Sequence, residues 1–258
     1  MPGGYAHYRF GAQLLPKLSP EVRRVVKRHR ALFDVGLHGP DIFFYHNIWK
    51  KTAVVKLAHQ VHDTSGATVF TRAAKRLRLE PSEPGLAYLY GLLTHYCLDS
   101  HCHPFVNALA HGDDADHVAL ETEFDRFLLE TDGKTPPSTQ DCSLHMQLTP
   151  EECAIVATFF PGTTWQDVDK CVRTLAVTTK LLATPAGKLR QGINKLLPRS
   201  FSALVMFDHA DPRWCEHDEV LLERYNKALA AFPGLEKQIT AYLTCGVPLG
   251  DGFADIFG

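Results

Sequence analysis

The stretch that decides the fold reads LAYLYGLLTHYCLDSHCHP at residues 86–104, and DHVALE follows at residues 116–121. The first segment is as apolar as a buried helix, yet it carries His95, Asp99 and His103 at intervals of four residues. On a helix this interval stacks the three side chains on one face, one turn above the next. The segment therefore predicts a buried helix with a polar stripe along one side.

The second segment repeats the interval with His117 and Glu121, so five such groups project from two neighbouring helices. Taken singly, a histidine at a helix contact is more often a hydrogen-bonded core residue than a ligand, and one His-x-x-x-Asp pair is more often a surface ion pair than a pair of ligands. Burying several unpaired polar groups among apolar side chains costs free energy, however, and one bound cation satisfies several of them together. Imidazole and carboxylate are the ligands that zinc takes when thiolates do not hold it. We therefore expect a metal centre between the two helices.

The bulk composition sets the class of protein. The chain has 258 residues, 45% of them hydrophobic, and a formal net charge of -2. This length suits one large domain or two small ones, and the near-zero charge argues against a protein built mainly to hold nucleic acid. No apolar run reaches the length of a membrane-spanning helix, and residues 1–9 lack the apolar core of a signal peptide. The expected location is the cytoplasm.

The seven cysteines do not form a Cys-x-x-Cys pair. Reduced thiols are the expected state in that compartment. Cys97 and Cys102 lie within the deciding stretch but off the stripe of histidines and acids. We therefore expect no thiolate ligand.

The remaining pattern is helical throughout, and the predicted fold class is all-α. We expect one domain over residues 1–258, a helical bundle around the metal centre, because no segment alternates as a strand does. The expected helices cover 19–33 with Ser19 as N-cap, 50–79 as one long helix or a pair, 85–103 closed by Pro104, 116–130, a helix opening at 149, 165–183, 218–231 and 235–243. The aromatic residues of the last segment, 247–258, are expected to pack back onto the core.

Residues 39–41 read Gly-Pro-Asp and open an aromatic segment. Gly-Pro marks a turn. An acid followed by large apolar residues is either an N-cap or a metal ligand held against the core, and the sequence leaves Asp41 open between these two roles.

Several separate features resemble the zinc-dependent phospholipase C family and its relatives, the single-strand-specific zinc nucleases. The resemblance covers residues 1 to about 130 and rests on positions that occur in the family's order: His7 near the amino terminus, Gly39-Pro40-Asp41, His95-x-x-x-Asp99 followed by His103-Pro104, and His117-x-x-x-Glu121. It implies an all-helical bundle that binds two or three zinc ions.

The resemblance also implies how the ligands divide. One zinc would be held by Asp41, His62, His95 and Asp99, a second by His103, His117 and Glu121, and a third by Asp99 and His7. His59 competes with His62 for one position, since one helical turn separates them. Asp41 would be both a ligand and the candidate catalytic base.

The implied function is a phosphodiester hydrolase of the phospholipase C type, in which zinc-activated water attacks the phosphate. Its substrate would be a phospholipid or another phosphodiester, with transient contact to a membrane surface. One alternative is a nuclease on the same scaffold, the only interpretation in which nucleic acid is a partner. Another is a phosphohydrolase of the His-Asp type, from the dipeptide His62-Asp63. A third is a metal-stabilised helical protein without catalysis.

Overall fold

A computed structural model describes residues 4–47, 50–183 and 199–257 of the chain. The predicted all-α class is confirmed: within these ranges the chain forms helices and a single isolated β-bridge, with no strand. In chain order the elements are α1 Gly4–Leu14, η1 Leu15–Lys17, α2 Pro20–Arg28, α3 Arg30–Gly36, η2 Gly39–His46, α4 Ala53–His62, α5 Gly66–Leu79, α6 Glu83–Ala110, α7 Asp114–Thr131, η3 Pro137–Thr139, α8 Pro150–Ala157, α9 Trp165–Leu182, α11 Arg199–Ser202, η4 Cys215–His217, α12 Asp218–Cys245 and η5 Asp251–Phe253.

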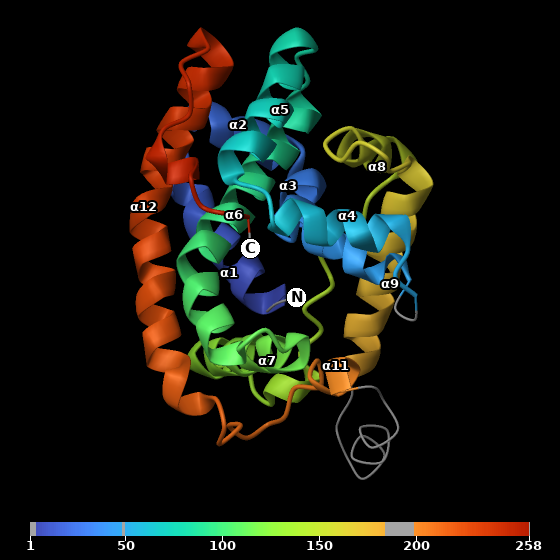
Figure 1. Ribbon diagram of the computed structural model, residues 1–258, viewed down its shortest axis with the longest axis vertical. Helices are drawn as coiled ribbons and strands as arrows, with labels where there is room; N and C mark the ends of the chain where they lie inside the picture. Colours follow the sequence, from blue (N-terminus) through green and yellow to red (C-terminus); the bar gives the residue numbers. More distant parts are fainter. Residues whose placement is uncertain (1–3, 48–49, 184–198, 258) are drawn as a thin grey trace.

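The deciding stretch forms α6, which runs through the middle of the molecule and packs against α3, α12, α7 and α1 (Figure 1). Ser82 caps it by accepting a hydrogen bond from the Gly85 amide. Helix α3 can approach α6 closely because two glycines meet: a Cβ added at Gly91 would lie 2.3 Å from the Phe33 carbonyl oxygen and 2.8 Å from the Gly36 Cα. This contact fixes the start of the following η2 segment against α6.

Pro104, which was expected to end a helix, lies inside one, and so does Pro233. Helix α6 continues past Pro104 to Ala110, and the two helices predicted at the end of the chain are one helix, α12, with Pro233 inside it. Both prolines are exposed, so the carbonyl that loses its amide partner faces water. Buried residues follow each of them, Val106 after the first and Leu235 after the second. Packing of the buried face therefore overrides the local preference.

Other boundaries also differ from the predictions. The helix expected over 19–33 is split into α2 and α3 at His29, whose backbone φ and ψ of -117° and 48° are not helical. Ser19 precedes α2, but its side chain makes no capping hydrogen bond. The 50–79 region is a pair of helices, α4 and α5, and the predicted capping box at Thr149 is present in α8.

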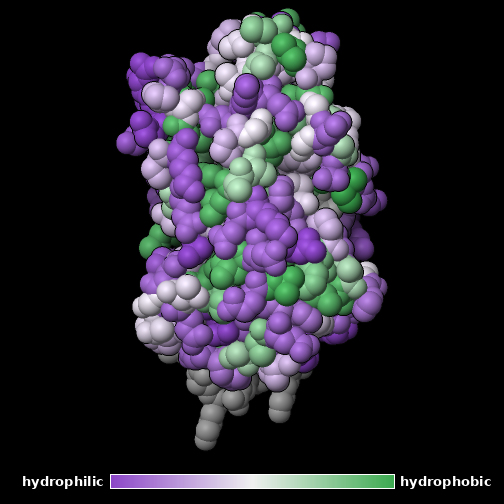
Figure 2. Space-filling view, turned by 90° about the vertical axis from the view of Figure 1, so that its left-hand side faces the viewer, coloured by the Kyte–Doolittle hydropathy of each residue, from purple (hydrophilic) through white to green (hydrophobic). Residues whose placement is uncertain are grey.

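The chain end closes the bundle as expected. Phe253 and Phe257 are fully buried, and their rings contact Phe70 of α5 and Tyr96 of α6. Helix α12 covers one side of the bundle, and Figure 2 shows that side with hydrophilic residues interspersed among smaller hydrophobic groups. Within the described residues, none of the helices has the length and apolar character needed to cross a bilayer.

Candidate metal centre

The first group of candidate ligands brings together side chains from three elements. His7 of α1, Asp41 of η2, and His95 and Asp99 of α6 each offer a ligand atom, and these atoms all lie within 4.8 Å of one another. All four residues are buried. The arrangement joins residues that are nearly a hundred positions apart in the chain, as a multidentate metal site does.

The hydrogen bonds of His95 fix which ring nitrogen is free to bind a metal. Its Nδ1 lies 3.2 Å from the Leu37 carbonyl oxygen, which can only accept, so Nδ1 carries a proton. Nε2 lies 3.0 Å from Asp99 Oδ2, and neither atom makes a hydrogen bond within the described part of the chain. Two buried polar atoms that face each other at this distance without a hydrogen bond fit a shared cation.

His62 lies at the edge of the first group, and both of its ring nitrogens have a partner. The Ala58 carbonyl lies 2.7 Å from its Nδ1, and its Nε2 lies 2.8 Å from Asp41 Oδ1. Asp41 therefore faces an imidazole and makes no side-chain cap, which decides against the N-cap alternative. His59 lies one turn away with an exposed ring against Phe44. Of the two candidates, the structure brings His62 to the site.

The second group lies between α6 and α7. Glu121 Oε1 is 3.2 Å from His103 Nε2 and 3.1 Å from His117 Nε2. Asp99 connects the two groups, because its Oδ1 is 3.1 Å from His7 Nε2 and 3.5 Å from His103 Nε2. All eight residues predicted from the sequence, including His62 beside Asp41, therefore belong to one continuous constellation.

The acids and imidazoles of this constellation perturb one another strongly. Burial alone raises the pKa of Asp99, but His103, His95 and His7 together hold that pKa well below its usual value. Burial likewise opposes ionisation of Glu121, yet His117 and His103 keep its pKa well below the ordinary range. The carboxylates are thus ionised at neutral pH, as metal ligands must be.

His103 and Asp41 complete this picture. Burial lowers the pKa of His103, but Asp99 and Glu121 outweigh that effect and raise it to about 9. Burial raises the pKa of Asp41, whereas His95 and His62 bring it below its ordinary value. In the metal-free protein, imidazolium therefore balances the buried negative charge that a divalent cation balances when bound.

A small cavity of about 30 Å³ lies between the two groups. Its walls include His7, Asp99, His103 and Glu121. The Nδ1 atoms of His7 and His103 make no hydrogen bond to any described residue, although both are buried. The Nε2 atoms of the same two rings face Asp99 and Glu121, and this set of imidazoles and carboxylates fits a site that can hold a metal ion.

One contributor was missed at the sequence level. Asp125 lies one turn beyond Glu121 on α7 and accepts hydrogen bonds from the backbone amides of Tyr5, at 2.9 Å, and Ala6, at 2.7 Å. It therefore anchors the start of α1 and places His7 beside Asp99. The interval of four residues places Asp125 on the same face of α7 as His117 and Glu121. Its partner Tyr5 lies 120 positions away in the chain, so no local pattern indicates that Asp125 anchors α1.

The family model described as zinc dependent phospholipase C matches residues 6–158, which is more than half of the 258-residue chain. The matched range contains all of the described ligand candidates. Neither a curated protein nor a solved structure matches the chain.

Proposed function

The chain belongs to the zinc-dependent phospholipase C family, and on that premise we propose that it hydrolyses phosphodiesters, with phospholipids as the main substrates. The observation that carries this proposal is one pair of buried atoms: His95 Nε2 and Asp99 Oδ2 lie 3.0 Å apart, and neither makes a hydrogen bond to a described residue. A purely structural cluster would place a donor opposite each acceptor. We further propose one domain over residues 1–258, located in the cytoplasm.

Two or three zinc ions are the proposed cofactors. Asp41, His62, His95 and Asp99 would hold the first ion, and His103, His117 and Glu121 the second. Asp99 and His7 would hold a third. His7 lies within 4.8 Å of Asp41, His95 and Asp99, and His62 lies 2.8 Å from Asp41, so these five residues are close enough to share ions. The carbonyls of Leu37 and Ala58 orient His95 and His62.

When bound, zinc supplies Lewis acidity toward the phosphate oxygens and makes a water molecule acidic near neutral pH. Asp41 is the proposed general base, because its pKa is held below the ordinary value and its carboxylate is therefore free to accept a proton. The second oxygen of Asp41 remains available while Oδ1 faces His62. His62 and His117 are the ligands with the more exposed side chains, at 14% and 18%, so the site opens toward α4 and the start of α7.

The nuclease alternative needs aromatic rings that are free to stack on bases. Of the aromatic residues near the site, Phe43 and Tyr96 are fully buried and Tyr45 is nearly so. Phe44 and Phe105 are half-buried. Few stacking surfaces therefore remain, which favours a lipid substrate and a transient contact with a membrane surface.

The test is an assay of zinc-loaded protein on phosphatidylcholine vesicles, single-stranded DNA and a chromogenic phosphodiester. We expect hydrolysis of the vesicles and the chromogenic ester, and its loss with a chelator. Asp41→Asn should lower turnover by about 10²-fold or more, because it removes the base while keeping the shape. Asp63→Asn is the matched control, because Asp63 is exposed beside His62 and the His-Asp alternative requires it. Cleavage of DNA alone, or a larger loss in Asp63→Asn, would contradict the proposal.

A further inference from the structure

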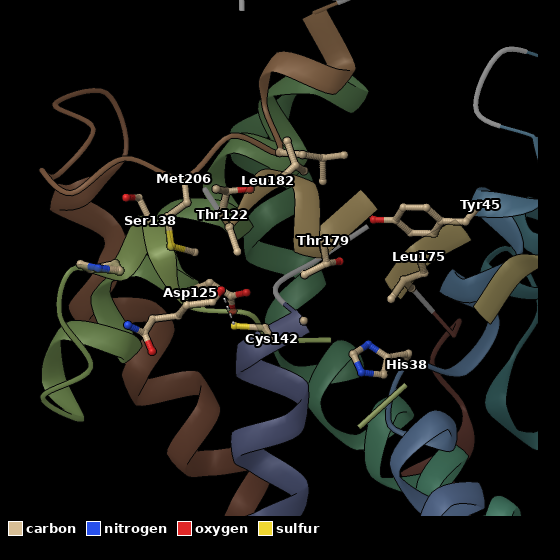
Figure 3. A pocket seen from close by; sticks show the side chains of 15 residues that line it. His38, Tyr45, Thr122, Asp125, Ser138, Cys142, Leu175, Thr179, Leu182 and Met206 are labelled. Atoms are coloured by element: carbon tan, nitrogen blue, oxygen red, sulfur yellow. Dashed lines mark hydrogen bonds between the residues drawn. The ribbon is translucent and has the colours of Figure 1, made fainter. Parts of the chain in front are cut away.

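A second cavity, of about 100 Å³, is lined by residues of α1, η2, α7, η3 and α9 (Figure 3). None of the proposed ligands lines it, but three of its residues follow closely on ligands in the chain. Gly4 precedes His7 by one turn, Tyr45 comes one turn after Asp41, and Thr122 follows Glu121 directly. The cavity therefore neighbours the metal centre through α1, η2 and α7.

Four hydroxyl groups line the cavity, from Tyr45, Thr122, Ser138 and Thr179. None of them makes a hydrogen bond to a residue that the structure describes. Two of these residues are almost fully buried, since Ser138 is 2% exposed and Tyr45 6%. The Tyr45 and Thr179 hydroxyls come from neighbouring elements, η2 and α9, and both lie at the cavity in Figure 3. The Ser138 hydroxyl is buried without a partner among the described residues, and together the four hydroxyls offer hydrogen bonds to a polar guest.

The charges of the walls narrow the class of guest. Asp125 is the one acidic group among the described lining residues, and each of its oxygens already accepts an amide hydrogen bond from the start of α1. His38 is engaged with His145 at 2.7 Å. The described lining residues include no Lys or Arg, so these residues offer an anionic guest no counter-charge. A quaternary ammonium group prefers a cage of several aromatic rings, and Tyr45 supplies one ring.

Size and wall shape agree with a small polar guest that has a carbon skeleton. Leu175, Leu182 and Met206 form an apolar wall beside the hydroxyls. A cavity of roughly 150 Å³ holds one benzene ring, so this one cannot take two acyl chains. The acyl part of a lipid substrate therefore stays outside it, and the headgroup side of the phosphate is the part that fits.

We propose that this cavity is a headgroup subsite for a neutral, hydroxyl-rich group of the glycerol type. Each hydroxyl of such a guest can both donate and accept, as can the four wall hydroxyls, and the apolar wall covers its carbon atoms. The inference rests on the proposed phosphodiester hydrolysis and adds the headgroup that the reaction selects.

The test uses p-nitrophenyl esters of glycerol phosphate, choline phosphate and methyl phosphate, in which p-nitrophenolate replaces the diacylglycerol as leaving group. Zinc-loaded protein should hydrolyse the glycerol ester with a kcat/KM at least about tenfold above that of the methyl ester, because unpaired wall hydroxyls penalise a guest without hydroxyls. Equal values for the three esters, or a preference for the choline ester, would overturn the inference.

Variants identify the cavity as the source of the preference. Thr179→Val and Tyr45→Phe each remove one wall hydroxyl and should lower kcat/KM for the glycerol ester by about five- to tenfold, with the methyl ester changed by less than about twofold. Thr178→Val is the matched control, since Thr178 neighbours Thr179 on α9 but does not line the cavity. Equal losses on both esters would show a structural role instead.

A binding measurement separates failure of this inference from failure of the proposed function. In calorimetric titrations of zinc-loaded protein, glycerol 1-phosphate should bind at least about tenfold more tightly than methyl phosphate, and Thr179→Val should remove the difference. If no ester is hydrolysed, the proposed function fails and this titration still decides the subsite. Equal affinities would mean that the cavity holds only water.

Discussion

At the scale of single residues, Asp99 occupies the central position of the constellation. One of its oxygens lies 3.1 Å from His7 and 3.5 Å from His103, and the other lies 3.0 Å from His95. A carboxylate with two oxygens can hold two cations at once, which an imidazole cannot. Asp99 therefore connects sites that Glu121 does not.

The first prediction compares these two acids. Asp99→Ala should lose more zinc per chain than Glu121→Ala, and should melt at a lower temperature, because it disturbs more than one ion. Elemental analysis and thermal unfolding of both variants, purified in parallel, measure this. Equal zinc losses, or a larger loss in Glu121→Ala, would leave Asp99 as an ordinary ligand.

The second prediction concerns the proton on His103. Its pKa of about 9 in the metal-free protein lies above the ordinary value of 6.5, so its ion pairs stabilise the fold fully below pH 6.5 and lose that effect as pH rises through 9. Zinc must displace this proton, so zinc affinity should rise up to about tenfold per pH unit between pH 7 and 8.5. Chelator-competition titrations at several pH values measure the slope. An affinity independent of pH would show that His103 is already neutral or is not a ligand.

Local sequence spacing was sufficient for one part of the site. The interval of four residues identified His95, Asp99, His103, His117 and Glu121, because a helix turns any such interval into a shared face. His7, Asp41 and His62 have no such interval linking them to α6. The local pattern left Asp41 open between an N-cap and a ligand, and only the family resemblance indicated His7 and His62. Their positions depend on how α1, η2 and α4 pack, which no local pattern encodes.

At the scale of elements, the close contact of α3 with α6 determines where η2 begins. This contact depends on Gly91, where a side chain has no room. The Leu37 carbonyl that orients His95 comes directly after α3. Packing of two glycines is therefore linked to the orientation of a proposed ligand.

The third prediction tests this link. Gly91→Ala should lower the free energy of unfolding by about 1–3 kcal/mol, because the new methyl group would overlap the Phe33 carbonyl. Gly234→Ala is the control: it lies in α12 with nothing within 4 Å of an added Cβ, so it should stabilise the protein by about 1 kcal/mol. Chemical denaturation of both variants measures the difference. A neutral Gly91→Ala would mean that α3 can move away from α6 without cost.

Helix existence was predictable from the sequence, and helix ends were less so. The helix start expected at Thr149 was correct, and the Thr149 side chain caps it. Pro104 was wrong as a helix end, and the break expected between residues 231 and 235 was wrong as well. A proline on the exposed side loses one hydrogen bond that water replaces, whereas burial of the following residues continues to favour the helix. The continuation of both helices past their prolines depends on long-range packing, which no local sequence pattern encodes.

At the scale of the whole molecule, the proposed metals join α1, η2, α4, α6 and α7, so their binding should stabilise the folded state by mass action. The fourth prediction is that a chelator lowers the melting temperature and that added zinc restores it. The measurement is thermal unfolding with metal removal confirmed by elemental analysis. An unchanged melting curve after complete removal would place the metals at the periphery instead of between the helices.

The measurement that tests the central claim most directly is the zinc content of protein that has never been exposed to a chelator. The buried pair of His95 Nε2 and Asp99 Oδ2, the orphaned imidazole nitrogens and the two ligand groups predict two or three zinc ions per chain. Elemental analysis by plasma mass spectrometry gives this number without any assumption about substrate. Less than one transition metal per chain would contradict the account.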